Sequence, residues 1–283
     1  MLATLLIVFR EVIEAGLIVG IVMAATKGVP RRGLWVSYGV LGGIAGACLV
    51  AAFAGELSSL FAGSGQELFD ATILLLAVVM LTWHNVWMAG HGRAMAREMK
   101  MVGASVSAGD RPMTALAIVV GVAVLREGSE VVLFLYGIAS SGGTSQLEML
   151  TGGALGLAAG AAVSALMYFG LLSIPASKLF RVTAGLITLL AAGMAAQAVL
   201  FIQQGGYFEV MTRSLWDTSW ILPQGGAGIR GLIGQMLHTL VGYSDSPNGA
   251  QLAAYAGTIL AITALMRWER ARHPRGEPVA NPA

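Results

Sequence analysis

Charge and cysteine are scarce in this chain. Of its 283 residues only 11% are charged, whereas a soluble domain carries about 25%. The single cysteine, Cys48, lies in an apolar run, which excludes an intrachain disulfide and a thiolate metal cluster. No Gly-x-x-x-x-Gly-Lys, His-Glu-x-x-His or Gly-x-Ser-x-Gly sequence occurs, so the chain shows neither an ATP site nor a hydrolase signature. The 56% of hydrophobic residues and the mean hydropathy of +0.75 predict an integral membrane protein.

The sequence contains long apolar stretches with few charged residues. A bilayer core needs about 20 apolar residues per helix. Backbone polar groups in lipid must pair within their own segment, and the alternation typical of a barrel is absent, so the stretches predict helices. The expected fold is an all-α membrane protein with seven transmembrane helices, at Leu2–Ala25, Leu34–Ala54, Ala71–Ala89, Met113–Ser140, Thr151–Ile174, Val182–Ile202 and Ala250–Met266.

Basic residues indicate the orientation. They cluster after the first, third, fifth and seventh stretches, while the other side has only Arg213 and Arg230. The positive-inside rule then predicts an N-terminus outside and a cytoplasmic C-terminus, in a multi-pass protein of the cytoplasmic (inner) membrane. The first stretch carries Arg10, Glu11 and Glu14 where a signal peptide would be apolar, which predicts a retained helix.

Two halves of the chain resemble each other. Thr72–Met80 and Leu186–Met194 agree at five of nine positions, and the first and fourth stretches both contain Arg-Glu-x-x-Glu. Because three helices per repeat is an odd number, the second repeat is expected to be inverted relative to the first. The expected organisation is one permease domain with repeats at 1–100 and 111–203, an outer loop at 204–249, a seventh helix at 250–267 and a cytoplasmic tail at 268–283.

The two charged motifs lie near the middle of their stretches. Each charge there costs about 2.5–3.5 kcal/mol on insertion scales. Residues three or four apart share a helix face, so two packed antiparallel helices would bring four carboxylates and two guanidiniums to one cavity, with a net charge of about −2. One Glu per Arg would suffice for ion pairs that only tie helices together, so the surplus carboxylates favour a cation site. Carboxylates suit hard cations such as Fe³⁺. The residues are Arg10, Glu11, Glu14, Arg126, Glu127 and Glu130.

These motifs resemble the oxidase-dependent iron permease family, which includes fungal high-affinity and bacterial iron-uptake permeases. The matching sequences are FREVIEAGLIVG, LREGSEVVLFL, QELFD, LTW, LWDTSW and GYSDSP.

The resemblance implies a transporter rather than an enzyme. It would import iron, ferric by expectation, across the cytoplasmic membrane beside an extracytoplasmic oxidase or iron-binding protein. The chain would contact membrane lipid and no nucleic acid. Iron would be the substrate, with no permanently bound cofactor. Its ligands would be Glu11, Glu14, Glu127 and Glu130, supported by Arg10 and Arg126.

Five further residues are candidates for the path in or out. Glu67 and Asp70 begin the third stretch, where a favourable helix dipole explains acidic residues equally well. Asp217 and Asp245 lie in the outer loop, in sequences that also form turns. His84 falls late in the third stretch, where it either lines an exit or bonds a neighbouring helix.

Other functions remain open at this stage. The same carboxylates would suit a permease for lead or another divalent cation. A metal-binding membrane sensor is a further alternative. A di-iron enzyme usually adds Glu-x-x-His motifs, which neither motif-bearing stretch contains.

Overall fold

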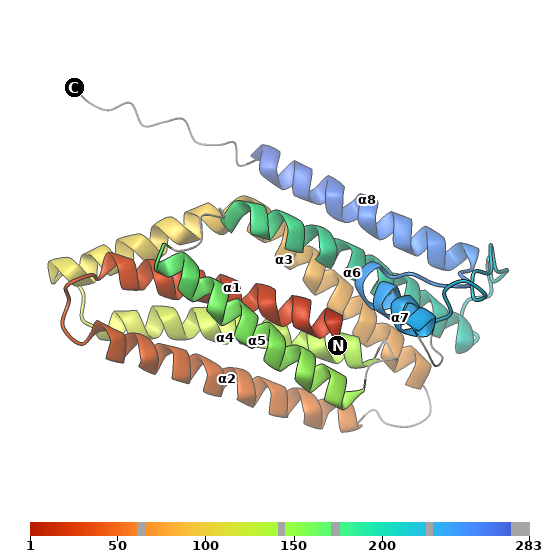
Figure 1. Cartoon of the computed structure of the whole chain (residues 1–283), viewed down its shortest axis with the longest axis horizontal. Coiled ribbons are helices and arrows are strands. Elements are labelled where there is room, and N and C mark those ends of the chain that lie inside the picture. Colours follow the sequence, from red (N-terminus) through yellow and green to blue (C-terminus); the bar gives the residue numbers. More distant parts are fainter. Residues whose placement is uncertain (61–65, 141–144, 171–175, 225–228, 273–283) are drawn as a thin grey trace.

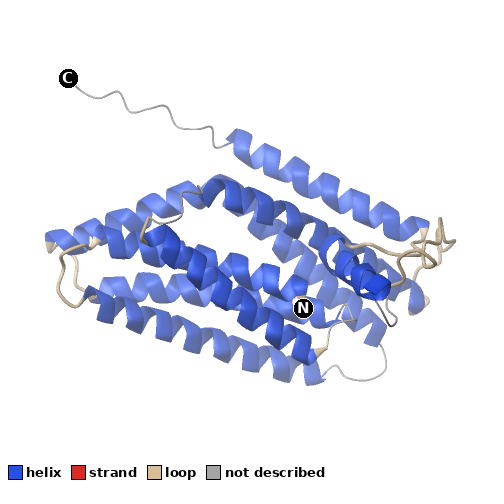
Figure 2. Cartoon of the chain, in the orientation of Figure 1, coloured by secondary structure: helices blue, strands red, loops and turns tan. Residues whose placement is uncertain are grey.

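The chain folds into a bundle of helices (Figures 1 and 2). The computed structural model describes residues 1–60, 66–140, 145–170, 176–224 and 229–272. Within these ranges the β-structure is an isolated antiparallel bridge between Ser214 and Asn248. The helices are α1 Leu2–Ala25, α2 Arg32–Leu60, α3 Gln66–Ala108, α4 Thr114–Ser140, α5 Gln146–Tyr168, α6 Ala176–Gln204, α7 Ile229–Val241 and α8 Gly249–Arg272.

Among the described residues, five helices are long and apolar enough to cross a membrane. These spans are Arg32–Phe53, Glu67–Met88, Gln146–Tyr168, Phe180–Gln204 and Gly249–Arg272. α1 and α4 are 24 and 27 residues long, but each carries three charged residues in its middle. The expectation of an all-helical membrane protein is confirmed. The count of seven spans and the orientation of the termini stay predictions.

α3 differs from the expected third helix. A loop was expected after Ala89, but the helix continues to Ala108 and has 43 residues. At 1.5 Å per residue it is about 65 Å long, roughly twice the hydrocarbon thickness of a bilayer. Its second half is therefore a helical extension beyond the apolar span. Of the other expected segments, residues 171–174 and 273–283 lie outside the described part.

The two halves of the bundle are interlocked. The most extensive contacts are those of α2 with α4 and of α1 with α5, followed by those of α3 with α6. The first helix of each expected repeat thus packs on the second helix of the other. Glycines permit this approach: a Cβ on Gly156 would lie 2.6 Å from the Leu5 carbonyl oxygen, and one on Gly39 would lie 2.6 Å from the Ala117 carbonyl oxygen. Small residues at helix contacts are typical of membrane bundles.

α7 and α8 complete the bundle. Figure 1 shows α7 near the start of α1, and α7 contacts both α6 and α1. α8 packs along α6 and α3. A buried apolar core shared by α1, α3, α4, α6 and α8 includes Phe134, Leu74 and Ile187. This core holds α3 against the motif-bearing helices.

Candidate metal site

Three helices supply one buried cluster of ionisable side chains. α1 contributes Glu11, α4 contributes Glu127 and Glu130, and α3 contributes His84. One ligand atom from each of these four residues lies within 4.8 Å of the others. Glu11, His84 and Glu127 are at most 3% exposed. This spacing and donor set suit the first coordination shell of a metal ion.

The α1 side of the cluster is an ion-pair network. Arg10 Nε lies 3.0 Å from Glu14 Oε1, and Arg10 Nη1 lies 3.5 Å from Glu11 Oε1. The first pair is four residues apart, on one helix face. All three side chains are nearly inaccessible. One guanidinium therefore orients both carboxylates of its own motif.

The α4 side repeats this network with more exposure. Arg126 Nε lies 3.1 Å from Glu130 Oε1 and 3.9 Å from Glu127 Oε1. Its guanidinium also lies 4.2 Å from the ring centroid of Trp87 on α3, a cation–π geometry. The Arg126 side chain is 32% exposed, against 3% for Arg10. The two motifs are alike in sequence, but their surroundings differ.

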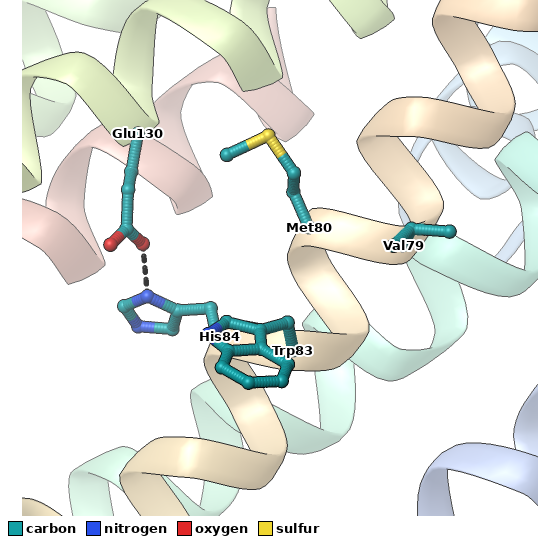
Figure 3. Close-up of a pocket in the computed structure, with 5 residues that line it drawn as sticks. All are labelled: Val79, Met80, Trp83, His84 and Glu130. Carbon is teal, nitrogen blue, oxygen red and sulfur yellow. Dashed lines mark ion pairs between the residues drawn. The ribbon is translucent and has the colours of Figure 1, made fainter.

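His84 joins the two motif-bearing helices. Its Nδ1 pairs with Glu130 Oε2 (Figure 3). Its Nε2 lies 3.4 Å from Glu14 Oε2 and 3.8 Å from Glu11 Oε2. The contact with a neighbouring helix, one of the two possibilities left open by the sequence, is present. It extends to α1 and α4 at once and places His84 inside the carboxylate cluster. A role of His84 on an exit path stays a prediction. A sequence signal for this position of His84 exists, because an ionisable residue within an apolar span usually marks a functional site.

Several carboxylate oxygens of the cluster lack hydrogen-bond donors. Both oxygens of Glu11 and Oε2 of Glu127 are buried and accept no hydrogen bond from the described residues. The nearest cationic group to Glu11 is Arg10, at 3.5 Å. A buried polar atom without a hydrogen bond costs about 1–3 kcal/mol. A bound cation would remove that cost, so the arrangement favours cation binding.

A cavity adjoins the cluster beside α3. Its volume is about 170 Å³, and its lining consists of Val79, Met80, Trp83, His84 and Glu130 (Figure 3). Trp83 is 71% exposed. The cavity therefore connects the surface beside Trp83 with His84 and Glu130.

The other predicted residues lie outside the cluster. Glu67 and Asp70 are in the first turns of α3. The Asp217 carboxylate accepts a hydrogen bond of 2.9 Å from the Ser219 amide, and bonds from the Ser219 side chain and backbone hold the pKa of Asp217 below its ordinary value. The Asp245 carboxylate accepts from the Gln224 amide at 2.9 Å. Asp217 therefore acts as a turn residue, whereas Asp245 joins two segments that are 21 positions apart in the sequence. A role for either residue on the path of an ion stays a prediction.

Membrane-length helices around a buried acidic cluster define a multi-pass membrane protein with a candidate cation site. Comparison of the sequence with known families narrows this class. The chain belongs to the iron permease FTR1 family, whose profile matches residues 1–270. Members of this family are permeases, so the protein is a transporter and not an enzyme.

Relatives cover almost the whole chain. The ferrous iron permease EfeU of Shigella sonnei is 29% identical over 259 residues, which are 90% of this chain and 91% of the relative. The ferrous iron permease EfeU of Yersinia pestis is 29% identical over 263 residues, 90% of this chain and 89% of the relative. No solved structure matches the chain significantly. The family resemblance expected from the two motifs is thus confirmed.

Proposed function

We propose that this chain imports iron across the cytoplasmic membrane, with the ion held by Glu11, Glu14, Glu127 and Glu130. The observation that carries the proposal is the convergence of both motifs on one buried cluster in which several carboxylate oxygens lack donors. Family membership and the names of the relatives support iron as the cargo. Arg10 and Arg126 orient the carboxylates and reduce their mutual repulsion.

The proposed path crosses seven spans. α1 and α4 are the two spans in addition to the five apolar ones. The N-terminus is outside and the C-terminus in the cytoplasm, as the basic residues indicate. Iron reaches the outer segment at 204–249 first and then the cluster. It leaves beside the α3 extension, which carries Arg97 and Lys100. If the two repeats are inverted as expected, the site lies at their interface, as in other transporters of that design.

We infer that the ion crosses as Fe²⁺. Four motif carboxylates (−4) and two arginines (+2) leave the cluster with a formal charge of −2, which a divalent ion neutralises. Uncompensated charge is costly in a buried site. The relatives are also named ferrous iron permeases.

Ferric import is the second candidate, and the hardness of four carboxylates favours it. The extracytoplasmic oxidase belongs with this candidate, because an oxidase would produce the ferric ion. A permease for lead or another divalent cation would use the same charge balance as Fe²⁺.

Uptake into proteoliposomes tests the proposal. The purified chain is reconstituted, and radioactive iron is offered either as Fe²⁺ with ascorbate or as Fe³⁺ with citrate. We expect uptake of the ferrous form and a loss of at least tenfold in Glu11→Gln and in Glu127→Gln. Glu98→Gln is the matched control, because Glu98 is an exposed carboxylate on the α3 extension, and it should transport normally.

Three results would contradict parts of this reading. Uptake of the ferric form alone would replace the ferrous assignment. Stronger uptake of Pb²⁺ than of iron would change the cargo. Tight iron binding by intact, correctly folded protein without any uptake would make the chain a sensor.

A further inference from the structure

We propose that His84 is a ligand of the transported ion and makes the site prefer first-row transition metals to alkaline-earth cations. This inference rests on the proposed function, because it assigns a role within the same site. The relevant feature is an imidazole from a third helix that lies between two carboxylate motifs.

The position of the ring suits a ligand. His84 is 2% exposed, and a ring nitrogen lies within 4.8 Å of oxygens from Glu11, Glu127 and Glu130. Nε2 lies 3.4 Å from Glu14 Oε2 and Nδ1 is paired with Glu130 Oε2. With an ion bound between His84 and Glu130, Nδ1 would coordinate the ion while Nε2–H donates to Glu14. Metal-bound histidines usually donate their other ring N–H to a carboxylate in this manner.

The imidazole changes which ions the site prefers. Carboxylates alone suit Mg²⁺, Ca²⁺ and Mn²⁺, whereas imidazole suits Fe, Zn, Cu and Ni. Four carboxylates without a nitrogen donor would therefore discriminate poorly against Ca²⁺ and Mg²⁺. One nitrogen in the shell gives the later transition metals an advantage.

The second repeat does not duplicate this nitrogen. Thr72 aligns with Leu186, an offset of 114, which pairs His84 with Ala198 on α6. Ala198 is fully buried, and its methyl group offers no donor atom. A carboxylate-rich site built by two matching motifs thus receives one imidazole, from α3.

A purely positioning role for His84 is the alternative. In that case the ring would only hold Glu130 and Glu14 in place, and no nitrogen would coordinate the metal. Transport measurements alone do not separate these roles, because losing either function lowers uptake. Direct detection of a metal–nitrogen bond does separate them.

Pulsed electron paramagnetic resonance on the Mn²⁺-loaded protein provides that detection. We expect nitrogen modulation from a coordinated imidazole in the unmodified protein, and a changed modulation when its histidines carry nitrogen-15. His84→Gln should abolish the modulation, while His238→Gln on α7 should keep it. Loss in both variants, or no nitrogen modulation in the unmodified protein, would overturn the proposal. The absence of nitrogen modulation is measured on the unmodified protein, so the proposal is tested even if the His84→Gln protein misfolds.

Selectivity of uptake is the second measurement. In proteoliposomes, His84→Gln should weaken Fe²⁺ uptake affinity by about 10–100-fold, the range typical for disturbed metal shells. The affinity for Ca²⁺, measured as inhibition of uptake, should change far less. The ratio of Fe²⁺ affinity to Ca²⁺ affinity should therefore fall at least tenfold. An unchanged ratio would overturn the selectivity role. If the unmodified protein bound Mn²⁺ through His84 but moved no iron, the proposed function would fail while the ligand assignment stood.

Discussion

Substituting Gly156 by alanine should loosen the contact between α5 and α1. The new Cβ would lie 2.6 Å from the Leu5 carbonyl oxygen and 3.0 Å from the Phe9 nitrogen, whereas ordinary contact begins at 3.4 Å. The helices would have to separate by about 0.8 Å, the difference between 3.4 and 2.6 Å. Overpacking of this kind costs about 1–3 kcal/mol. That range corresponds to a roughly 5- to 150-fold change in the folding equilibrium constant.

Gly185→Ala is the matched control for this change. Gly185 also lies in a helix, α6, but a Cβ there would meet nothing within 4 Å. Both variants gain about 1 kcal/mol of helix propensity, so their difference isolates the cost of the clash. The measurement is equilibrium unfolding in detergent, followed by tryptophan fluorescence during titration with sodium dodecyl sulfate.

The expected result is a lower unfolding midpoint for Gly156→Ala than for Gly185→Ala. Because α1 carries Glu11, the first variant should also take up iron more weakly in proteoliposomes. Equal midpoints for the two variants would refute the reasoning, since the glycine would then not set the distance between these helices.

The arginines and the outer loop supply further predictions. Arg10→Gln should destabilise the fold by about 3–5 kcal/mol, because it leaves Glu11 and Glu14 buried without their counter-ion. Arg126→Gln should cost far less, because Arg126 is partly exposed. Denaturant titration of both variants compares the two losses of stability, and equal losses would contradict this prediction. Asp217→Asn should increase amide exchange at Ser219 at neutral pH. Since the pKa of Asp217 is lowered in the folded state, its stabilising effect is present above the ordinary carboxyl pKa and is lost as the pH falls through the folded value. The difference in exchange from the unmodified protein should therefore disappear in acid, and a pH-independent difference would refute this assignment.

Local sequence patterns predicted helices well where lipid or a neighbour bounded them. α1 has the bounds expected from the sequence, Leu2–Ala25. The predicted end of α3 was wrong because it was placed where the hydropathy falls, after residue 89. The residues that follow include alanine, methionine, glutamate, arginine and lysine, which are good helix formers. A helix can therefore continue beyond the residues that cross the lipid.

The candidate site was predictable only in part. Pairing within each motif follows from a spacing of three or four residues, which the sequence displays directly. The contact of His84 with Glu14 joins residues 70 positions apart. It depends on how α3 packs between α1 and α4, which no local pattern encodes.

Two identical motifs do not make two identical halves. Arg10 is enclosed with its glutamates, whereas Arg126 lies over Trp87, and a cavity lies beside Glu130. These differences lie in the third helix of each expected repeat. α3 presents His84 and Trp87 to the cluster, and the 114-residue offset places Ala198 and Phe201 at the equivalent positions of α6. The glutamates of both motifs therefore supply the charge of the cluster, while α3 supplies its imidazole and lines the adjoining cavity.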